Sequence, residues 1–190
     1  MRAFIAIVLP SQIKGAVSKI QDELKTTLPK ISWTKPDNLH ITLKFLGEIS
    51  PQQLSGIKQI ITEVAKTNTG FKIKFKTIGV FPNIKQARII WIGTNQLPLR
   101  MKQIVEQLEL KCMKLGIPKE KRLFYNHITV GRIKNNTNTT DLEKELNKVR
   151  RDLINKDFEF DVGRIILFKS TLASTGPTYT VLDETSLKTT

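Results

Sequence analysis

Residues 38–47 read NLHITLKFLG, and residues 126–132 read NHITVGR. The two stretches contain the only histidines of the 190-residue chain, His40 and His127, and each histidine is followed by Ile-Thr. Alternation of polar and apolar residues is typical of a half-buried β-strand, because successive side chains of a strand point to opposite faces. We therefore predict two strands that each present a histidine and a threonine side by side, away from the core.

Uninterrupted alternation also predicts the neighbours of each histidine. It places the following side chains on the two outward faces: His40, Thr42 and Lys44 on the first strand, and His127, Thr129 and Gly131 on the second. The same alternation turns Phe45 toward the core. Lys44 is then either a solvated lysine or a contact to a phosphate.

The flanking sequence predicts alternating strands and helices. Apolar spacing, capping residues and turn residues predict helices at 10–27, 50–67, 97–115 and 141–155, and strands at 2–9, 71–80, 86–92, 157–169 and 177–183. An Asn- and Thr-rich stretch, 135–140, and the sequence STGP, 174–177, are typical of loops. A His-Ile-Thr strand, a helix and an extended segment follow one another at 40–76 and again at 127–168. This order predicts a single α+β domain, residues 1–190, with two similar lobes and a shared cleft.

The charge balance favours a polyanionic partner. The chain has 31 Lys and Arg against 17 Asp and Glu, which gives a net charge of +14 and a pI near 10. Nucleic acid suits such a surface, because phosphate contacts release counterions; the alternative is a lysine-rich surface that interacts only with solvent. No apolar run is long enough to span a bilayer, no signal peptide is evident, and Cys112 has no second cysteine to pair with. We therefore expect a globular cytoplasmic protein without membrane contact.

A pair of histidines on exposed strand faces suits acid–base catalysis. Near neutral pH, one imidazole can accept a proton from a nucleophile while the other, as imidazolium, donates a proton to a leaving oxygen. The hydroxyls of Thr42 and Thr129 could donate hydrogen bonds to a phosphate between the histidines, and Arg132 could add a charge-assisted contact. A structural role is the ordinary alternative for either histidine alone. Because both histidines of the chain occur in the same motif, we favour phosphodiester cleavage.

Other catalytic chemistries fit the sequence less well. A metal site would need further ligands, and neither motif has a carboxylate on the histidine face. Cys112 lies within a helical apolar pattern, which indicates burial rather than a nucleophilic role. The chain has no glycine-rich phosphate loop of the Walker or dinucleotide type. We therefore expect neither a metal nor a cofactor.

Four stretches, in order along the chain, resemble the LigT-like RNA 2′,3′-cyclic phosphodiesterases of the two-histidine phosphoesterase superfamily, also called RNA 2′–5′ ligases. They are FIAIVLP at 4–10, WTKPDNLHITLKFLGE at 33–48, NHITVGRIK at 126–134 and ILFKSTLASTGPTYTVL at 166–182. The resemblance implies a bilobed fold with an antiparallel sheet in each lobe, helices packed outside and a central cleft. It also implies metal-independent hydrolysis of a terminal 2′,3′-cyclic phosphate on RNA to a 2′-phosphomonoester. In that reaction His40 resembles the proton donor and His127 the proton acceptor. Asn126 departs from the family, many of whose members have proline before the second histidine.

The resemblance leaves two other functions open. An ATP-independent 2′–5′ RNA ligase would run the related reverse reaction, and a noncatalytic module would bind RNA through a basic cleft. Trp33, Phe124 and Tyr125 either pack or stack on a terminal base, and Arg122 is either a surface charge or a substrate contact. We expect a monomer that acts on RNA ends, for which tRNA halves are one candidate.

Overall fold

The structure is a computed structural model that describes residues 1–28, 31–134, 139–155, 158–174 and 176–189. Residues 135–138 of the predicted Asn- and Thr-rich loop and Thr175 of the predicted turn lie outside these residues. The elements follow one another as β1 (Arg2–Val8), α1 (Ser11–Thr27), β2 (Ile31–Trp33), the 3₁₀ helix η1 (Pro36–Asn38), β3 (His40–Glu48), α2 (Pro51–Thr67), β4 (Phe71–Lys74), β5 (Thr77–Phe81), the 3₁₀ helix η2 (Ile84–Gln86), β6 (Ile89–Gly93), α3 (Leu99–Met113), β7 (His127–Ile133), α4 (Thr139–Asn155), β8 (Glu159–Val162), β9 (Arg164–Ala173) and β10 (Gly176–Ser186).

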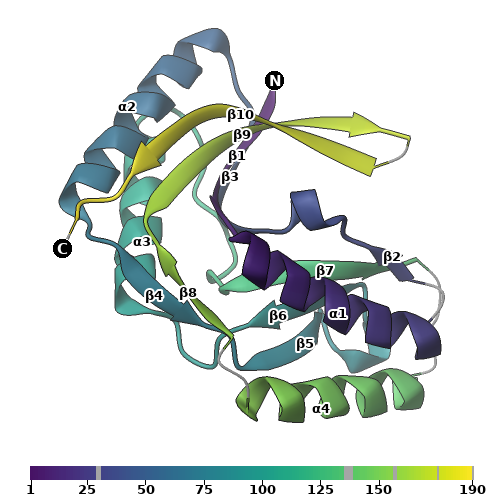
Figure 1. Ribbon diagram of the computed structural model, residues 1–190. Coiled ribbons are helices and arrows are strands. Elements are labelled where there is room, and N and C mark those ends of the chain that lie inside the picture. Colours follow the sequence, from purple (N-terminus) through teal and green to yellow (C-terminus); the bar gives the residue numbers. More distant parts are fainter. Residues whose placement is uncertain (29–30, 135–138, 156–157, 175, 190) are drawn as a thin grey trace.

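Two antiparallel lobes meet at the histidine strands. The strand order is β10-β9-β1-β3-β7-β6-β5, β2 pairs with β7, and β4 pairs with β8 in a separate small sheet. Within the described residues, β3 and β7 are joined by one backbone pair, Ile41 with Ile128, and both side chains are fully buried. Figure 1 shows α2 beside α3 along one lobe and α1 beside α4 along the other. The predicted α+β fold with two lobes and outer helices is therefore confirmed.

The two lobes repeat the same strand register. In the first lobe, β3 and β1 pair His40 with Val8, Thr42 with Ala6, Lys44 with Ile5 and Phe45 with Phe4. In the second lobe, β7 and β6 pair His127 with Gly93, Thr129 with Trp91, Gly131 with Ile90 and Arg132 with Ile89. Both histidine strands skip a residue at the same place, Leu43 in β3 and Val130 in β7, which is a β-bulge, and β3 has a second register shift after Phe45. The internal duplication predicted from the two His-Ile-Thr motifs is therefore present in the backbone.

Local sequence signals account for several element boundaries. Helix α2 begins after Ser50, whose hydroxyl accepts a hydrogen bond from the backbone N–H of Gln53 at 3.2 Å, while the Gln53 side chain accepts from the Ser50 N–H at 3.0 Å. Helix α3 ends shortly before Gly116, which has a φ of 76° that favours glycine. Apolar residues at helical spacing form the buried faces of α1 and α2, which include Ile13, Val17 and Leu24 in α1 and Ile57, Ile61 and Val64 in α2.

Two predicted strands are each divided in the structure. The segment 71–80 forms β4 and β5, because β4 pairs with β8 whereas β5 pairs with β6. The described part of the predicted segment 157–169, residues 158–169, contains β8 and the start of β9, with Gly163 between them, and residue 157 lies outside the described residues. A strand that changes partner must bend, and the sequence pattern of one buried strand does not show such a change. Among the described helices, none has the length and apolar character needed to cross a membrane.

Candidate active site

His40 is held at the start of β3 by a hydrogen bond to its own turn. Its Nδ1 lies 2.7 Å from the carbonyl oxygen of Asn38, and its Nε2 lies 3.1 Å from the hydroxyl of Thr42. A carbonyl oxygen only accepts, so Nδ1 carries the proton in this bond and Nε2 of the neutral ring accepts from Thr42. The ring therefore presents Nε2, with its lone pair, on the side where Thr42 lies.

His127 has the equivalent arrangement in the second lobe. Its Nδ1 donates to the carbonyl oxygen of Tyr125 at 2.7 Å, which again leaves Nε2 as the nitrogen that can exchange a proton. Extending the Ile41–Ile128 register by one residue sets His40 beside Thr129 and Thr42 beside His127 on the face opposite the buried isoleucines. The structure therefore brings both predicted histidine–threonine pairs to one face.

Arg132 reaches this face because of the bulge in β7. The β6–β7 register passes from Thr129 to Gly131 without pairing Val130, so the side chain of Arg132 is exposed on the histidine side instead of turning inward. Its positive charge lowers the pKa of both His40 and His127. Arg132 therefore lies close enough to both imidazoles to interact with an anion placed between them.

The matching bulge in β3 reverses two predictions. Lys44 was expected to share the face of His40, but it is 1% exposed and its Nζ lies 2.7 Å from Glu109 Oε2 in the interior. Phe45 was expected in the core, but it is 57% exposed and its ring lies 6.5 Å from that of Phe4. Both predictions were wrong for the same reason, because alternation continues only as far as the bulge.

Burial makes both imidazoles poor bases in the unliganded protein. It lowers the pKa of His40 to about 4; the Asn38 carbonyl opposes this shift, and the charges of His127 and Arg132 add to it. Burial is also the largest cause of the lowered pKa of His127, which the Tyr125 carbonyl partly offsets. Both rings are therefore neutral at pH 7 in the unliganded protein. An anion bound between them would raise both pKa values, since opposite charge favours the imidazolium form.

Comparison with known proteins identifies the family of this chain. Residues 7–91 and 92–179 each match the family model described as LigT like Phosphoesterase. The chain belongs to the LigT-like phosphoesterase family. A relative from Aquifex aeolicus (strain VF5), named RNA 2′,3′-cyclic phosphodiesterase, is 34% identical over 97% of this chain and 96% of its own length. A protein of the same name from Methanocaldococcus jannaschii is 37% identical over 97% of this chain and 99% of its own length.

Solved structures show the same LigT-like fold. The crystal structure of TT0787 of Thermus thermophilus has a TM-score of 0.83 and 24% sequence identity, over 100% of this chain and 99% of that one. The structure of Escherichia coli LigT complexed with 3′-AMP has a TM-score of 0.77 and 23% identity, over 98% of this chain and 97% of that one. The two LigT-like matches along the sequence agree with the duplicated register of the two lobes.

Aromatic rings surround both histidines of this LigT-like chain. The ring of His40 lies 4.9 Å from Phe4 and 5.2 Å from Tyr179, and the ring of His127 lies 5.2 Å from Phe81. These three neighbours come from β1, β10 and β5, far from the motifs in sequence. Only a known strand order would identify them, although the strand alternation of FIAIVLP places Phe4 on one face with Ala6.

The other aromatic candidates have different positions. Tyr125 is exposed at the edge of the site, with its ring 4.8 Å from Trp91 and 6.4 Å from His127. Trp33 packs over Gly131, where a side-chain Cβ would come within 3.0 Å of the indole ring. Phe124 is half-buried against the main core. Of these three candidates, Tyr125 alone has a ring contact with a histidine, and Arg122 is exposed in the segment before it.

Two further features lie outside the histidine site. Cys112 is buried in α3, and burial raises its pKa to about 11, so the thiol is protonated at neutral pH. Within the described residues, no group of three or more His, Cys, Asp or Glu side chains is arranged to hold a metal ion.

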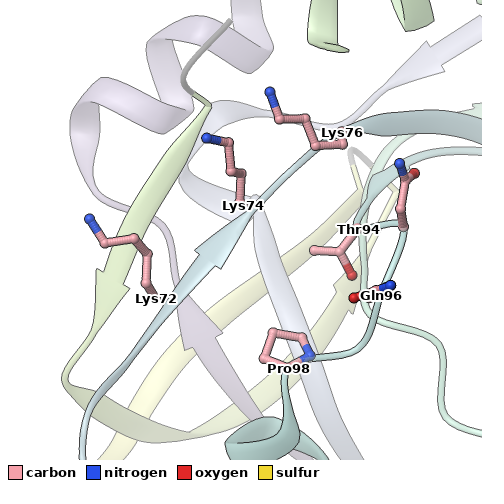
Figure 2. A pocket seen from close by; sticks show the side chains of 7 residues that line it. Lys72, Lys74, Lys76, Thr94, Gln96 and Pro98 are labelled. Carbon is pink, nitrogen blue, oxygen red and sulfur yellow. The ribbon is translucent and has the colours of Figure 1, made fainter.

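A separate pocket contains neither histidine. Figure 2 shows its lining residues, which are Lys72, Lys74, Lys76, Thr94, Asn95, Gln96 and Pro98. Glu159 forms ion pairs with Lys72 at 3.0 Å and with Lys74 at 3.3 Å, and Lys76 donates to the Ile154 carbonyl at 2.7 Å. We interpret this pocket as an ion-paired part of the surface.

Proposed function

We propose that this chain is an RNA 2′,3′-cyclic phosphodiesterase, which hydrolyses a terminal 2′,3′-cyclic phosphate to a 2′-phosphomonoester. One observation carries the proposal: both imidazoles donate Nδ1–H to a backbone carbonyl and so present Nε2 on one face, beside Arg132. The names of the relatives from A. aeolicus and M. jannaschii support the same activity. Those names also favour hydrolysis over the ligase and the noncatalytic alternatives.

The proposed reaction balances with two histidines. His127 Nε2 takes a proton from water, the water oxygen attacks phosphorus, the bond from phosphorus to the ribose 3′-oxygen breaks, and His40 Nε2–H protonates that oxygen. His127 then releases its proton to solvent and His40 takes one up, which restores the starting state. The assignment of His40 as donor and His127 as acceptor follows the family resemblance. The two imidazoles supply both proton transfers, so the proposal requires no cofactor.

The phosphate would be held by the groups around the histidines. Thr42 and Thr129 lie beside the imidazoles and would donate hydrogen bonds to nonbridging oxygens, and Arg132 would neutralise the charge that grows there. The same phosphate would raise the pKa of His40 from its value of about 4 in the unliganded protein, which a proton donor requires. Substrate binding would therefore favour the imidazolium form of His40, which is the form that can donate a proton.

The remaining parts of the proposal concern the unit and its substrate. Residues 1–190 would act as one bilobed catalytic unit and as a monomer, because both histidine strands belong to one chain. RNA with a cyclic phosphate end is the proposed substrate, and tRNA halves are one candidate. We place the activity in the cytoplasm, where the free thiol of Cys112 would stay reduced.

An end-labelled oligoribonucleotide with a 2′,3′-cyclic phosphate tests the function. We expect conversion of the cyclic end to a 2′-phosphomonoester, and we expect it to continue in excess EDTA. Joined strands as the main product would favour the ligase, and retarded but unchanged RNA would favour a noncatalytic module. Loss of turnover in EDTA and its return with a divalent ion would contradict the two-histidine mechanism.

The pH dependence follows from the lowered histidine pKa values. The quantity kcat/KM reports the free enzyme and requires one protonated and one neutral histidine, so its profile is bell-shaped. A lowered pKa means that each histidine loses its proton at a lower pH than a free histidine does. Both limbs of the kcat/KM profile therefore shift to lower pH, and kcat/KM is highest below pH 6.5. In the substrate complex, the phosphate raises these pKa values and moves the alkaline limb of kcat upward. An alkaline limb of kcat/KM above about pH 8 would contradict the cause proposed here.

Phe45 is the exposed aromatic residue that the bulge adds to the histidine face. We propose that it stacks on the terminal base, since a stacked base contributes about 1 to 3 kcal/mol. Phe45→Ala should raise KM by about 5- to 100-fold with little change in kcat. Phe45→Tyr should remain close to the parent protein. The matched control is an abasic terminal cyclic phosphate, on which Phe45→Ala and the parent protein should behave alike; an equal defect on that substrate would remove Phe45 from base recognition.

A further inference from the structure

A buried ion pair lies directly behind the histidine face. Lys44 Nζ and Glu109 Oε2 are 2.7 Å apart, and the two side chains are 0% and 8% exposed. Two backbone groups complete the cluster: Lys44 Nζ also donates to the Pro118 carbonyl at 3.1 Å, and the Glu120 N–H donates to Glu109 Oε2 at 3.3 Å. Lysine and glutamate are almost never buried to this extent unless they are paired. The burial of Lys44 and Glu109 therefore depends on their pairing with each other.

The pair links the approaches to the two histidines. Lys44 lies on β3, two residues beyond Thr42 and immediately after the skipped residue of the bulge. Glu109 lies on α3, and the segment that contains Pro118 and Glu120 connects α3 to His127 at the start of β7. The cluster therefore joins the strand of one histidine to the segment that leads into the other.

Backbone pairing fixes these two strands against each other at one place, although both strands also contribute apolar side chains to the same core. In the described residues, the backbone pair between β3 and β7 is Ile41 with Ile128, and β3 and β7 carry different lobes on either side of it. A buried ion pair contributes little net stability compared with apolar residues of similar volume, but its directional bonds restrict geometry. Acid–base catalysis is sensitive to such restriction, because a misplacement of about 1 Å can cost roughly 100-fold in rate.

The second lobe lacks an equivalent pair among the residues that the structure describes. The residue that corresponds to Lys44 in the repeated register is Gly131, and Trp33 and Ile31 pack in the space that a side chain would take there. The second lobe therefore forms the same backbone bulge without a buried charge at this position. The bulge alone does not explain why Lys44 and Glu109 occupy the interior of the first lobe.

We propose that Lys44 and Glu109 are positioning residues that set the placement of His40 relative to His127; this inference rests on the proposed phosphodiesterase function. The pair acts through β3 and through the segment before β7, and it does not touch the substrate. Its removal misaligns the acid and the base without emptying the site, so kcat falls while KM changes little.

The test replaces the pair with apolar residues of similar length. Lys44→Met alone leaves Glu109 buried and unpaired, and we expect the Tm to fall by roughly 10 °C. Adding Glu109→Met should return the Tm to within a few degrees of the parent protein, while kcat on the cyclic phosphate stays about 10- to 100-fold low and KM stays within about twofold. The matched control is Lys72→Met with Glu159→Met, the same change at an exposed ion pair, which should leave kcat unchanged.

A second readout separates positioning from a general structural role. In a His40→Ala background the acid is already absent, so the added Lys44→Met and Glu109→Met changes should lower kcat by less than about threefold. Partial unfolding would instead lower kcat by the same factor in both backgrounds. If the double variant does not recover its Tm, Glu109→Asp tests the inference instead, because it keeps the negative charge and shortens the side chain. We expect Glu109→Asp to have a reduced kcat at a near-parental Tm.

Several outcomes would overturn the inference. Recovery of both Tm and kcat in the apolar double variant would do so, as would an equal loss in the His40→Ala background or parental kcat in a stable Glu109→Asp variant. Failure of the proposed function gives a different result, because the parent protein itself would then leave the cyclic phosphate unhydrolysed.

Discussion

Replacing His40 or His127 by alanine is expected to lower kcat by about 10²- to 10⁴-fold, the range for loss of a positioned acid or base. The two rings lie on the histidine face rather than in the main core, and Ile41 and Ile128 provide the buried contacts of these strands. We therefore expect Tm and circular dichroism close to those of the parent protein. Near-parental kcat in either variant would mean that the histidine concerned is structural.

Replacing both histidines together tests whether they act in the same step. If the two histidines act in one concerted step, His40→Ala with His127→Ala should cost little more than the worse single change, because groups that act as a unit are strongly non-additive. Two independent losses that multiply would indicate that the imidazoles do not share a transition state. A stable fold in all three proteins is the control for this comparison.

Replacing Arg132 by alanine is expected to lower kcat/KM by about 10²- to 10³-fold, comparable with the removal of a group that stabilises charge in the transition state. The side chain is exposed, so little folding stability depends on it. Arg132→Lys should recover only part of the loss, because lysine keeps the charge but lacks the planar pair of donors that matches a phosphate.

Arg151→Ala is the matched control for this prediction. Arg151 is an exposed arginine on α4, and its removal changes the net charge by the same amount. We expect its kcat/KM to stay within about twofold, since a distant surface charge is screened at ordinary salt. An equal loss in the two variants would mean that Arg132 contributes only general electrostatic attraction.

The two histidines have nearly the same surroundings, so another difference between the lobes must determine which of them acts as the acid. Both histidines use the same Nδ1 bond and both have a threonine two residues later. The matching bulges then place different residues on the two sides, Phe45 in the first lobe and Arg132 in the second. An aromatic ring favours a base and a guanidinium favours a phosphate. This difference would orient the nucleotide and so determine which histidine meets the leaving oxygen.

Sequence reasoning was reliable as far as each bulge and failed beyond it. His40 and Thr42, like His127 and Thr129, are two residues apart on regular strand, so alternation placed them correctly. A bulge shifts the side chains that directly follow it to the other face, and no residue in KFLG or VGRI identifies it. Gly131, which was expected on the outward face, is buried for this reason. Lys44 and Phe45 were therefore exchanged. The position of Arg132 was expected from its closeness to the motif, whereas the structure explains it by the bulge.

The helices were predictable for a different reason. Their boundaries depend on local signals, such as Ser50 at the start of α2 and Gly116 after α3. The rings of Phe4, Tyr179 and Phe81 reach the histidines through pairings between distant strands, and a single sequence does not determine strand order. The buried partner of Lys44 is likewise contributed by α3, 65 residues along the chain.

The most direct test of the central claim uses a cyclic phosphate with sulfur in place of the bridging 3′-oxygen. A thiolate is a more stable leaving group and departs without a proton, so the need for the acid disappears while the need for the base remains. We predict that His40→Ala, which is severely impaired on the normal substrate, recovers most of its deficit in kcat on the 3′-thio substrate, and that His127→Ala does not. Rescue of His127→Ala alone would exchange the two roles, and equal rescue of both variants would contradict the division into acid and base.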